Sequence, residues 1–167
     1  IAFGLSLRAN RGKGSREQVV ERMLQRTGLS AFRQRKPAEL SGGMRQRAAI
    51  ASVLAINPST LLMDEPFGAL DSLTRSIMQD FLLEIWEEQR KTVVLVTHDI
   101  DEAIYLADRT VVMTAHPGRI CEIIDVDLPR PRRYEMRSDA AFIRLRDHVT
   151  EIVRTEAIQG AVASAIN

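Results

Sequence analysis

The chain has 167 residues, of which 45% are hydrophobic and 27% are charged, and its formal net charge is +1. This length suffices for one domain with a substantial core, and the near-neutral charge excludes a strong field that would favour nucleic acid or acidic lipid. The one cysteine, Cys121, excludes an internal disulfide, and the longest apolar run, 48–56, is far shorter than the roughly 20 residues that span a bilayer.

The first third of the chain is predicted to be mainly helical. Ser15 is expected to cap a helix, with Gln18 completing a capping box and Gly28 ending the helix. A second helix is expected to run from the glycine-rich segment 41–43 to about residue 56. Two helices separated by a broken segment are therefore expected before the first strand.

The middle of the chain is predicted to contain two short strands on either side of a long helix. Segment 60–63 is expected to be a buried strand, and the β-branched segment 92–97 is expected to be a strand covered on both faces. The helix is expected over residues 72–89. Its inner stripe is expected to consist of residues that recur every four positions: Leu73, Ile77, Phe81 and Ile85.

The next part is predicted to contain a short helix at 101–107 and then a hairpin. Strands at 110–114 and 119–126 are expected to be joined by a type II turn, because Pro117 and Gly118 suit its central positions. Alternation of strands and helices along the chain predicts an α/β fold with a mostly parallel sheet.

The C-terminal part is predicted to be a linker at 129–133 with solvated arginines, followed by a helix over 139–155. Cys121 is expected in the core of its strand, and His116 and His148 are expected at the surface. The final helix is expected to bury one face: Phe142, Leu145, Val149 and Ile152.

A serine and two glycines, Ser41, Gly42 and Gly43, open the second predicted helix. Glycines let a phosphate approach the backbone, and the free N–H groups at a helix start favour an anion. Taken alone, the same residues are far more often an ordinary flexible helix cap.

Acidic and histidine side chains follow the two predicted parallel strands, where ligands bind in such sheets. Asp64 is a candidate ligand of Mg²⁺, and Glu65 is a candidate general base that polarises a water molecule. His98 can donate to a phosphate oxygen and orient an attacking water. Each residue also has a purely structural interpretation, and Asp71 is a candidate cap of the helix that follows it.

The order and spacing of these motifs resemble the ABC ATPase family over nearly the whole chain. The resemblance implies a P-loop NTPase-like core in which segment 41–43 is the signature motif, Asp64 and Glu65 end Walker B, segment 68–71 is the D-loop and His98 is the switch histidine. The resemblance implies ATP and Mg²⁺ as cofactors. It further implies these roles: catalysis for Glu65 and His98, metal binding for Asp64, and nucleotide binding for Ser41, Gly42, Gly43 and Asp71.

Segments 1–5, 63–71, 116–120 and 128–132 are similar to the nitrate, sulfonate and taurine importer group. This similarity implies an ATPase subunit that is peripheral at the cytoplasmic face of the membrane and drives uptake of a small anionic solute. It implies a second copy of the subunit and transmembrane permease subunits as partners, with no nucleic acid. Segment 15–40 is expected to touch a permease subunit.

One departure from the family is the absence of a Walker A loop, GxxxxGK[ST], and of the Q-loop glutamine. Segment 12–15 has a lysine and a serine among glycines but lacks the spacing and a preceding strand. Because the chain also starts at Ile1 rather than Met, we expect it to be N-terminally incomplete and inactive alone. The expected segments are a helical subdomain with the signature at 1–56, part of the ATPase core at 57–128, and a linker with the last helix at 129–167.

Two other functions are compatible with these motifs. One is a soluble ABC ATPase without a transport role, and the other is a non-catalytic interaction module. The first class usually has two cassettes or a long coiled coil, neither of which is visible, and the intact Glu65 and His98 argue against the second.

Overall fold

The structure, a computed structural model, describes residues 16–115 and 117–165, with side chains as far as residue 160. It forms two compact units, Ile1–Val96 and Thr97–Asn167. This boundary is not among those expected from the sequence, and the three-segment division remains a prediction. The expected cap Ser15, segment 12–15 and His116 lie outside the described residues.

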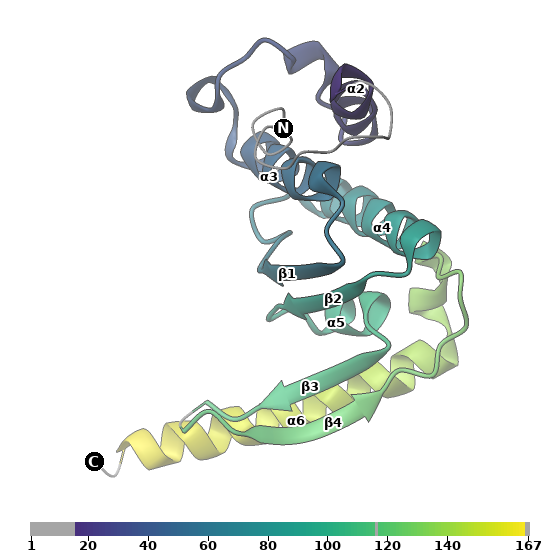
Figure 1. Cartoon of the computed structure of the whole chain (residues 1–167). Coiled ribbons are helices and arrows are strands. Elements are labelled where there is room, and N and C mark those ends of the chain that lie inside the picture. Colours follow the sequence, from purple (N-terminus) through teal and green to yellow (C-terminus); the bar gives the residue numbers. More distant parts are fainter. Residues whose placement is uncertain (1–15, 116, 166–167) are drawn as a thin grey trace. The chain divides into compact units, whose positions relative to one another are not determined.

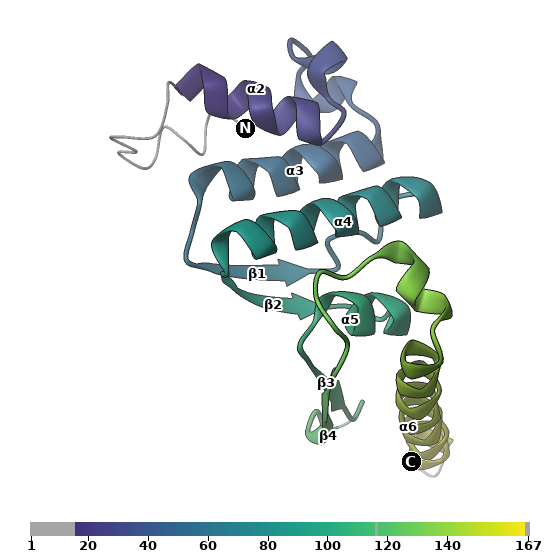
Figure 2. The same ribbon diagram turned by 90° about the vertical axis from the view of Figure 1, so that its right-hand side faces the viewer.

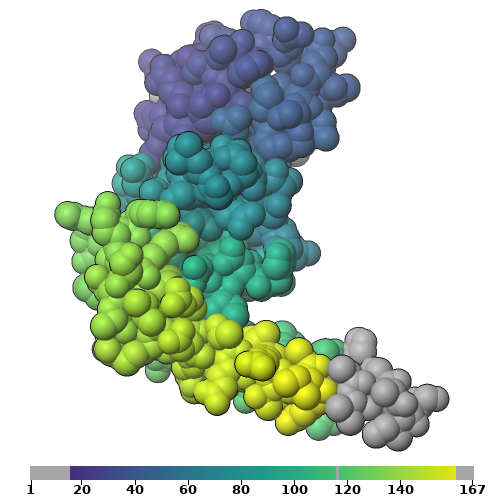
Figure 3. Space-filling view, turned by 180° about the vertical axis from the view of Figure 1, so that it is seen from behind, coloured from purple at the N-terminus to yellow at the C-terminus, as the bar shows by residue number. Residues whose placement is uncertain are grey.

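The described part of the first unit begins with helices α2 (Arg16–Arg26) and α3 (Gly42–Ile56), which pack on each other (Figure 1). Between them lie the short 3-10 helices η1 (Ser30–Phe32) and η2 (Pro37–Glu39). In the space-filling view, α2 and this connecting segment lie side by side at the top (Figure 3). α2 ends as predicted, because Gly28 adopts the left-handed φ of 65° that favours glycine after a helix.

In the described part of the first unit, the sheet consists of the parallel strands β1 (Thr60–Asp64) and β2 (Thr92–Val96), connected by α4 (Ser72–Gln89). Figure 2 shows α4 and then α3 and α2 stacked over one side of these strands. The predicted coverage of both faces is wrong, because Leu62 is 76% exposed and Val94 is 51% exposed. No described helix of this unit lies over that face, so the strands alternate between buried and open positions.

The bounds of α4 match the prediction, but its buried stripe does not. Phe81 and Ile85 are buried, whereas Leu73 is 71% exposed and Ile77 is 54% exposed. Four residues advance a helix by slightly more than one turn, so a strict four-residue repeat drifts by about 40° at each step and leaves the core. The buried positions of α4 instead use mixed spacings: Met78, Gln79, Phe81, Leu82, Leu83 and Ile85.

The second unit contains α5 (Ile100–Leu106), the strands β3 (Arg109–Met113) and β4 (Ile120–Asp125), η3 (Tyr134–Ser138) and α6 (Ala140–Ala165). β3 and β4 form the predicted antiparallel hairpin, and α6 contacts α5, β3 and η3. α6 extends ten residues beyond the expected end at residue 155. Two of its four expected core residues, Phe142 and Val149, are fully buried.

The hairpin connection is not the type II turn that Pro117 and Gly118 suggested. That turn needs a positive φ at Gly118, and among the described glycines only Gly28 has one. Thr114 closes the loop instead. Its N–H donates to the carbonyl of Arg119 at 2.9 Å, and its hydroxyl accepts from the N–H of Arg119 at 3.0 Å.

The predicted solvation of the arginines at 129–133 is wrong for Arg132. Its guanidinium is buried and donates to the carbonyls of Ile104, Tyr105 and Ala107, at distances of 2.6–3.1 Å. The last carbonyls of a helix have no partner within the helix, so α5 needs such a donor at its end. Burial and the neighbouring charge of Arg130 lower the pKa of Arg132 to about 10, which leaves it cationic at neutral pH.

Cys121 lies on a strand as predicted, but it is exposed rather than in the core. Its Sγ lies 3.6 Å from Oε1 of Glu156 on α6. His148 is at the surface as predicted, with Nε2 2.9 Å from Oε1 of Glu122. Within the part of the chain that the structure describes, no helix is both long enough and apolar enough to cross a bilayer.

Candidate functional site

The start of α3 is an N-terminal helix cap with an open surface. Ser41 is the cap residue, and its hydroxyl accepts from the N–H of Met44 at 3.2 Å while its own hydrogen can still donate to another group. A Cβ placed on Gly42 would meet no atom within 4 Å. The first turn of α3 can therefore be approached closely from outside the described chain, as an anion site at a helix start requires.

Asp64 is the last residue of β1, and Glu65 begins the loop that follows it. Glu65 adopts a φ of 45°, a left-handed conformation that is uncommon for a residue other than glycine. Its N–H donates to the carbonyl of Val96 at 2.9 Å, and its carbonyl accepts from the N–H of Gly68 at 3.3 Å. The backbone of the candidate base is thus held on both sides by hydrogen bonds, in a strained conformation of the kind that is concentrated at functional sites.

Asp71 ends this loop and caps α4, as predicted from the sequence. Its Oδ1 accepts from the N–H of Thr74 at 3.0 Å. This hydrogen bond lowers the pKa of Asp71, because it favours the ionised carboxylate. The loop between the acidic pair and Asp71 is anchored by Phe67 and Leu70, which are buried.

The start of α3 and the loop after β1 are in direct contact. The amide Nε2 of Gln46 donates to the carbonyl of Pro66 at 2.7 Å. A Cβ on Gly43 would lie 3.4 Å from the side chain of Leu70. The sequence interpretation did not single out Gln46, although a residue three positions after Gly43 lies on the same face of a helix.

His98 belongs to the second unit, just before α5. Asp99 caps this helix by accepting from the N–H of Glu102 at 3.0 Å, and its own N–H donates to the hydroxyl of Thr97 at 3.0 Å. Asp99 directly before a helix is an ordinary N-cap signal that the sequence interpretation overlooked. The predicted residues Ser41, Gly42, Gly43, Asp64, Glu65 and Asp71 thus share the first unit, and His98 lies in the second.

Magnesium chemistry fits the donors at the end of β1. Among residues 16–115 and 117–165, no group of three or more His, Cys, Asp or Glu side chains is arranged to hold a metal ion. Mg²⁺ usually takes one or two carboxylates and completes its shell with phosphate oxygens and water. The Asp64 carboxylate is exposed, so it could supply one such ligand to a magnesium ion that arrives with a nucleotide.

An α/β unit in which a parallel strand ends at Asp64, is followed by Glu65, and lies beside a glycine-rich helix start is typical of nucleotide-binding cassettes. Residues 4–68 match the protein family described as ABC transporter. The chain is 46% identical over 159 residues to an uncharacterized ABC transporter ATP-binding protein of Methanocaldococcus jannaschii, covering 95% of this chain and 58% of that protein. It is 46% identical over 156 residues to a taurine import ATP-binding protein of Pseudomonas savastanoi, covering 89% of this chain and 59% of that protein.

The fold agrees with these matches. A dimeric structure of a bacterial ABC transporter cassette superposes with a TM-score of 0.67 at 34% identity, covering 77% of this chain and 55% of that one. The chain belongs to the ABC transporter family of ATP-binding proteins. The resemblance and the α/β class predicted from the motifs are therefore confirmed, and the chain spans a little under three fifths of the length of the relatives that it matches.

Proposed function

We propose that the full-length protein containing this chain hydrolyses ATP as the energy-supplying subunit of an importer for a small anionic solute. The observation that carries this proposal is the geometry of Glu65, which is fixed at the end of β1 by its hydrogen bond to Val96. The membership of the ABC transporter family supports the reaction, and the relatives named for nitrate transport and aliphatic sulfonate import support the class of solute.

The residues at the strand ends have separate tasks in this proposal. Asp64 holds Mg²⁺, which neutralises phosphate charge when it is bound. Glu65 accepts a proton from the attacking water, and His98 donates a hydrogen bond to the terminal phosphate. Phosphoryl transfer depends mainly on such positioning and charge neutralisation, so carboxylates carried by a hydrogen-bonded strand end suit the reaction.

A second copy of the subunit is the partner that the start of α3 suggests. Ser41, Gly42 and Gly43 face away from the described chain or toward the loop of their own chain, so we infer that they serve the nucleotide of the second copy. The dimer of the structurally similar cassette supports this arrangement. Asp71 lies at the end of the loop that contacts Gly43, and we place it at the same interface.

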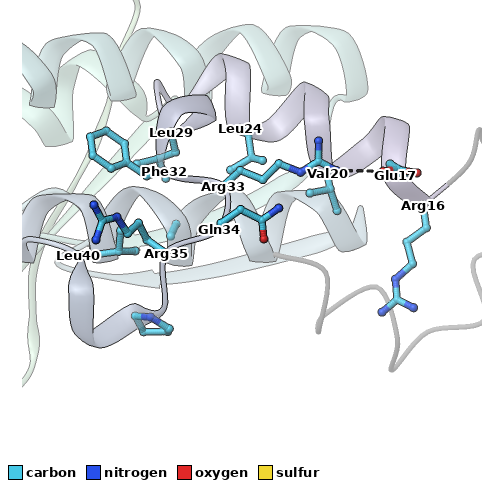
Figure 4. A pocket seen from close by; sticks show the side chains of 12 residues that line it. Arg16, Glu17, Val20, Leu24, Leu29, Phe32, Arg33, Gln34, Arg35 and Leu40 are labelled. Atoms are coloured by element: carbon cyan, nitrogen blue, oxygen red, sulfur yellow. Dashed lines mark hydrogen bonds and ion pairs between the residues drawn. The ribbon is translucent and has the colours of Figure 1, made fainter.

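A pocket of about 740 Å³ in the helical part of the first unit is the proposed site of a permease subunit (Figure 4). It is apolar at Leu24, Leu29 and Phe32 and is bordered by charged residues, among which Arg33 donates to Glu17 at 3.0 Å. An amphipathic segment of a partner fits a pocket of this composition. This partner would place the protein peripherally at the cytoplasmic face of the membrane.

The central experiment is Glu65→Gln in a polypeptide of the full length of the relatives. ATP binding should be retained, while turnover should fall by a factor of roughly 10²–10⁴, the usual worth of acid–base help. Glu151→Gln, an exposed position on α6, makes the same chemical change away from the site and should leave turnover unchanged. Steady-state hydrolysis near the wild-type rate in Glu65→Gln would show that another residue is the base.

The permease contact is tested by disulfide crosslinking in the assembled transporter. Cys121→Ser first removes the one cysteine of this chain, and Phe32→Cys then places a thiol at the pocket, to be paired with a cysteine introduced into a cytoplasmic segment of the permease. Crosslinks to a cytoplasmic segment of the permease are expected. Crosslinks that form only from positions on α6 would contradict the assignment.

A further inference from the structure

Gln46 makes a hydrogen bond that none of the family motifs explains. Its side-chain amide donates to the carbonyl of Pro66 at 2.7 Å, across 20 positions of sequence, and Pro66 directly follows Glu65. A proline has no N–H group, so its carbonyl is the only backbone group through which the residue can be held by a hydrogen bond. Gln46 therefore binds the only backbone group of Pro66 that can form a hydrogen bond, next to the candidate base.

The residues next to Pro66 in this loop are held by backbone hydrogen bonds and by one buried side chain. The carbonyl of Glu65 accepts from Gly68 at 3.3 Å, and the N–H of Leu70 donates to the carbonyl of Phe67 at 3.1 Å. Phe67 is only 1% exposed, so its side chain fixes the loop to the core. The Pro66 carbonyl belongs to the Pro66–Phe67 peptide, which lies between these anchors and follows the Glu65–Pro66 peptide, so it constrains the chain on the C-terminal side of Glu65.

The same helix touches this loop at a second point. Gly43 lies one turn before Gln46, and a Cβ there would be 3.4 Å from Leu70 and 3.6 Å from the carbonyl of Ala69. The first two turns of α3 thus contact the loop near both of its ends. On another side, the same turns present the open Gly42.

We propose that Gln46 is a positioning residue that links the start of α3 to the carboxylate of Glu65. A shift of α3 when a ligand binds at Gly42 would pull the Pro66 carbonyl through Gln46 and so reorient Glu65. This inference rests on the proposed function. In this inference, the side chain of Gln46 couples the nucleotide site at the start of α3 to the site that contains Glu65.

The test uses three variants of the full-length protein. Gln46→Glu is isosteric but cannot donate to a carbonyl when it is ionised, and it regains a donor when it is protonated. We expect turnover about tenfold below wild type near pH 8, the effect of losing one such hydrogen bond, with little change in KM for ATP. The ratio of variant to wild-type turnover should rise as the pH falls toward 6, because repulsion by the carbonyl raises the pKa of a carboxyl group at this position.

Gln46→Met has similar length and no donor, so it should lower turnover at every pH without recovery. Gln25→Glu, at an exposed position of α2, makes the same amide-to-acid change away from the loop and should match wild type. Wild-type turnover in Gln46→Glu and Gln46→Met would overturn the proposal. An equal loss in both variants with no pH-dependent recovery would also overturn it, since that result indicates a packing role.

The outcome can be separated from a failure of the proposed function. If Glu65→Gln abolishes turnover and the Gln46 variants behave as wild type, only the positioning role is wrong. If Glu65→Gln itself hydrolyses ATP normally, the assignment of the base is wrong and the premise of the Gln46 proposal is removed.

Discussion

The backbone N–H of Glu65 donates to the carbonyl of Val96 at 2.9 Å, which continues the pairing of β1 and β2 one residue past Asp64. Glu65 makes this bond in a left-handed conformation, with φ at 45°. The conformation costs a non-glycine residue about 1–2 kcal/mol, so the end of β1 stores strain at the candidate base.

This strain predicts that Glu65→Gly stabilises the protein while it abolishes turnover. Glycine removes the steric penalty of the left-handed conformation but loses more entropy on folding, so we expect a net gain of about 0.5–1 kcal/mol in the free energy of unfolding. Glu65→Ala loses the same carboxylate and keeps the strain, so it should be less stable than the glycine variant. Urea denaturation of both variants measures the difference, and equal stabilities would contradict the strain.

Gly42→Ala should leave folding intact and lower activity. No atom lies within 4 Å of the position that a Cβ would take, and alanine favours a helix more than glycine does. We expect an unchanged or slightly higher Tm with turnover reduced by about tenfold or more, because the methyl group would occupy space that the proposed nucleotide of the second copy needs.

Gly118→Ala is the matched control for Gly42→Ala. Its Cβ would also meet no atom within 4 Å, but Gly118 lies in the hairpin loop of the other unit. Tm and turnover should both remain at wild-type values. If Gly42→Ala has normal turnover as well, the start of α3 does not approach a nucleotide.

Asp71 should stabilise the protein in a pH-dependent way. Its pKa is lowered in the folded state by the N–H of Thr74, so its contribution is fully present above the ordinary value of 3.8 and is lost as the pH falls through the lower folded value. Asp71→Ala should therefore have a lower Tm than wild type near neutral pH, and this difference should shrink below pH 3.8.

Asp71→Asn separates capping from charge. Asparagine caps a helix without titrating, so its Tm advantage over Asp71→Ala should persist at low pH. Thermal unfolding at several pH values measures both differences. A gap between wild type and Asp71→Ala that widens as the pH falls would refute the role of the carboxylate.

Arg132 should be sensitive even to replacement by lysine. Three carbonyls at the end of α5 share its guanidinium, and a lysine ammonium cannot reproduce that planar geometry. We expect Arg132→Lys to cost about 1–3 kcal/mol in the free energy of unfolding, because buried acceptors lose their donor. Arg133→Lys, at the exposed neighbouring position, should stay within about 0.5 kcal/mol of wild type in the same urea titration.

The features that the sequence could predict depend on near neighbours in the chain. The caps Ser41 and Asp71 each accept from an N–H three residues away, so their own segments contain the whole interaction. The hairpin of β3 and β4 was also predictable, because its two strands are close together in the sequence. The signature and Walker B motifs predict chemistry at strand and helix ends, because such ends leave backbone groups and side chains accessible.

The features that could not be predicted depend on distant partners. Gln46 binds a carbonyl 20 positions away, and Arg132 binds carbonyls 25–28 positions away, so neither pattern is visible locally. The exposure of Leu73 and of Val94 has the same origin. An apolar residue is buried only if another element covers it, and the residue type carries no information about that element.

Cys121 provides a single site for thiol labelling in the second unit. It is the only cysteine in the chain and lies exposed on β4, so a maleimide fluorophore or spin label attaches at one known position without mutation of other thiols. Partial desolvation and the carboxylate of Glu156 raise the pKa of its thiol above 9.0, so labelling should be slow at neutral pH and faster in mildly alkaline buffer. Because Sγ lies 3.6 Å from Glu156 on α6, a spin label there would report directly on any separation of that helix from the hairpin.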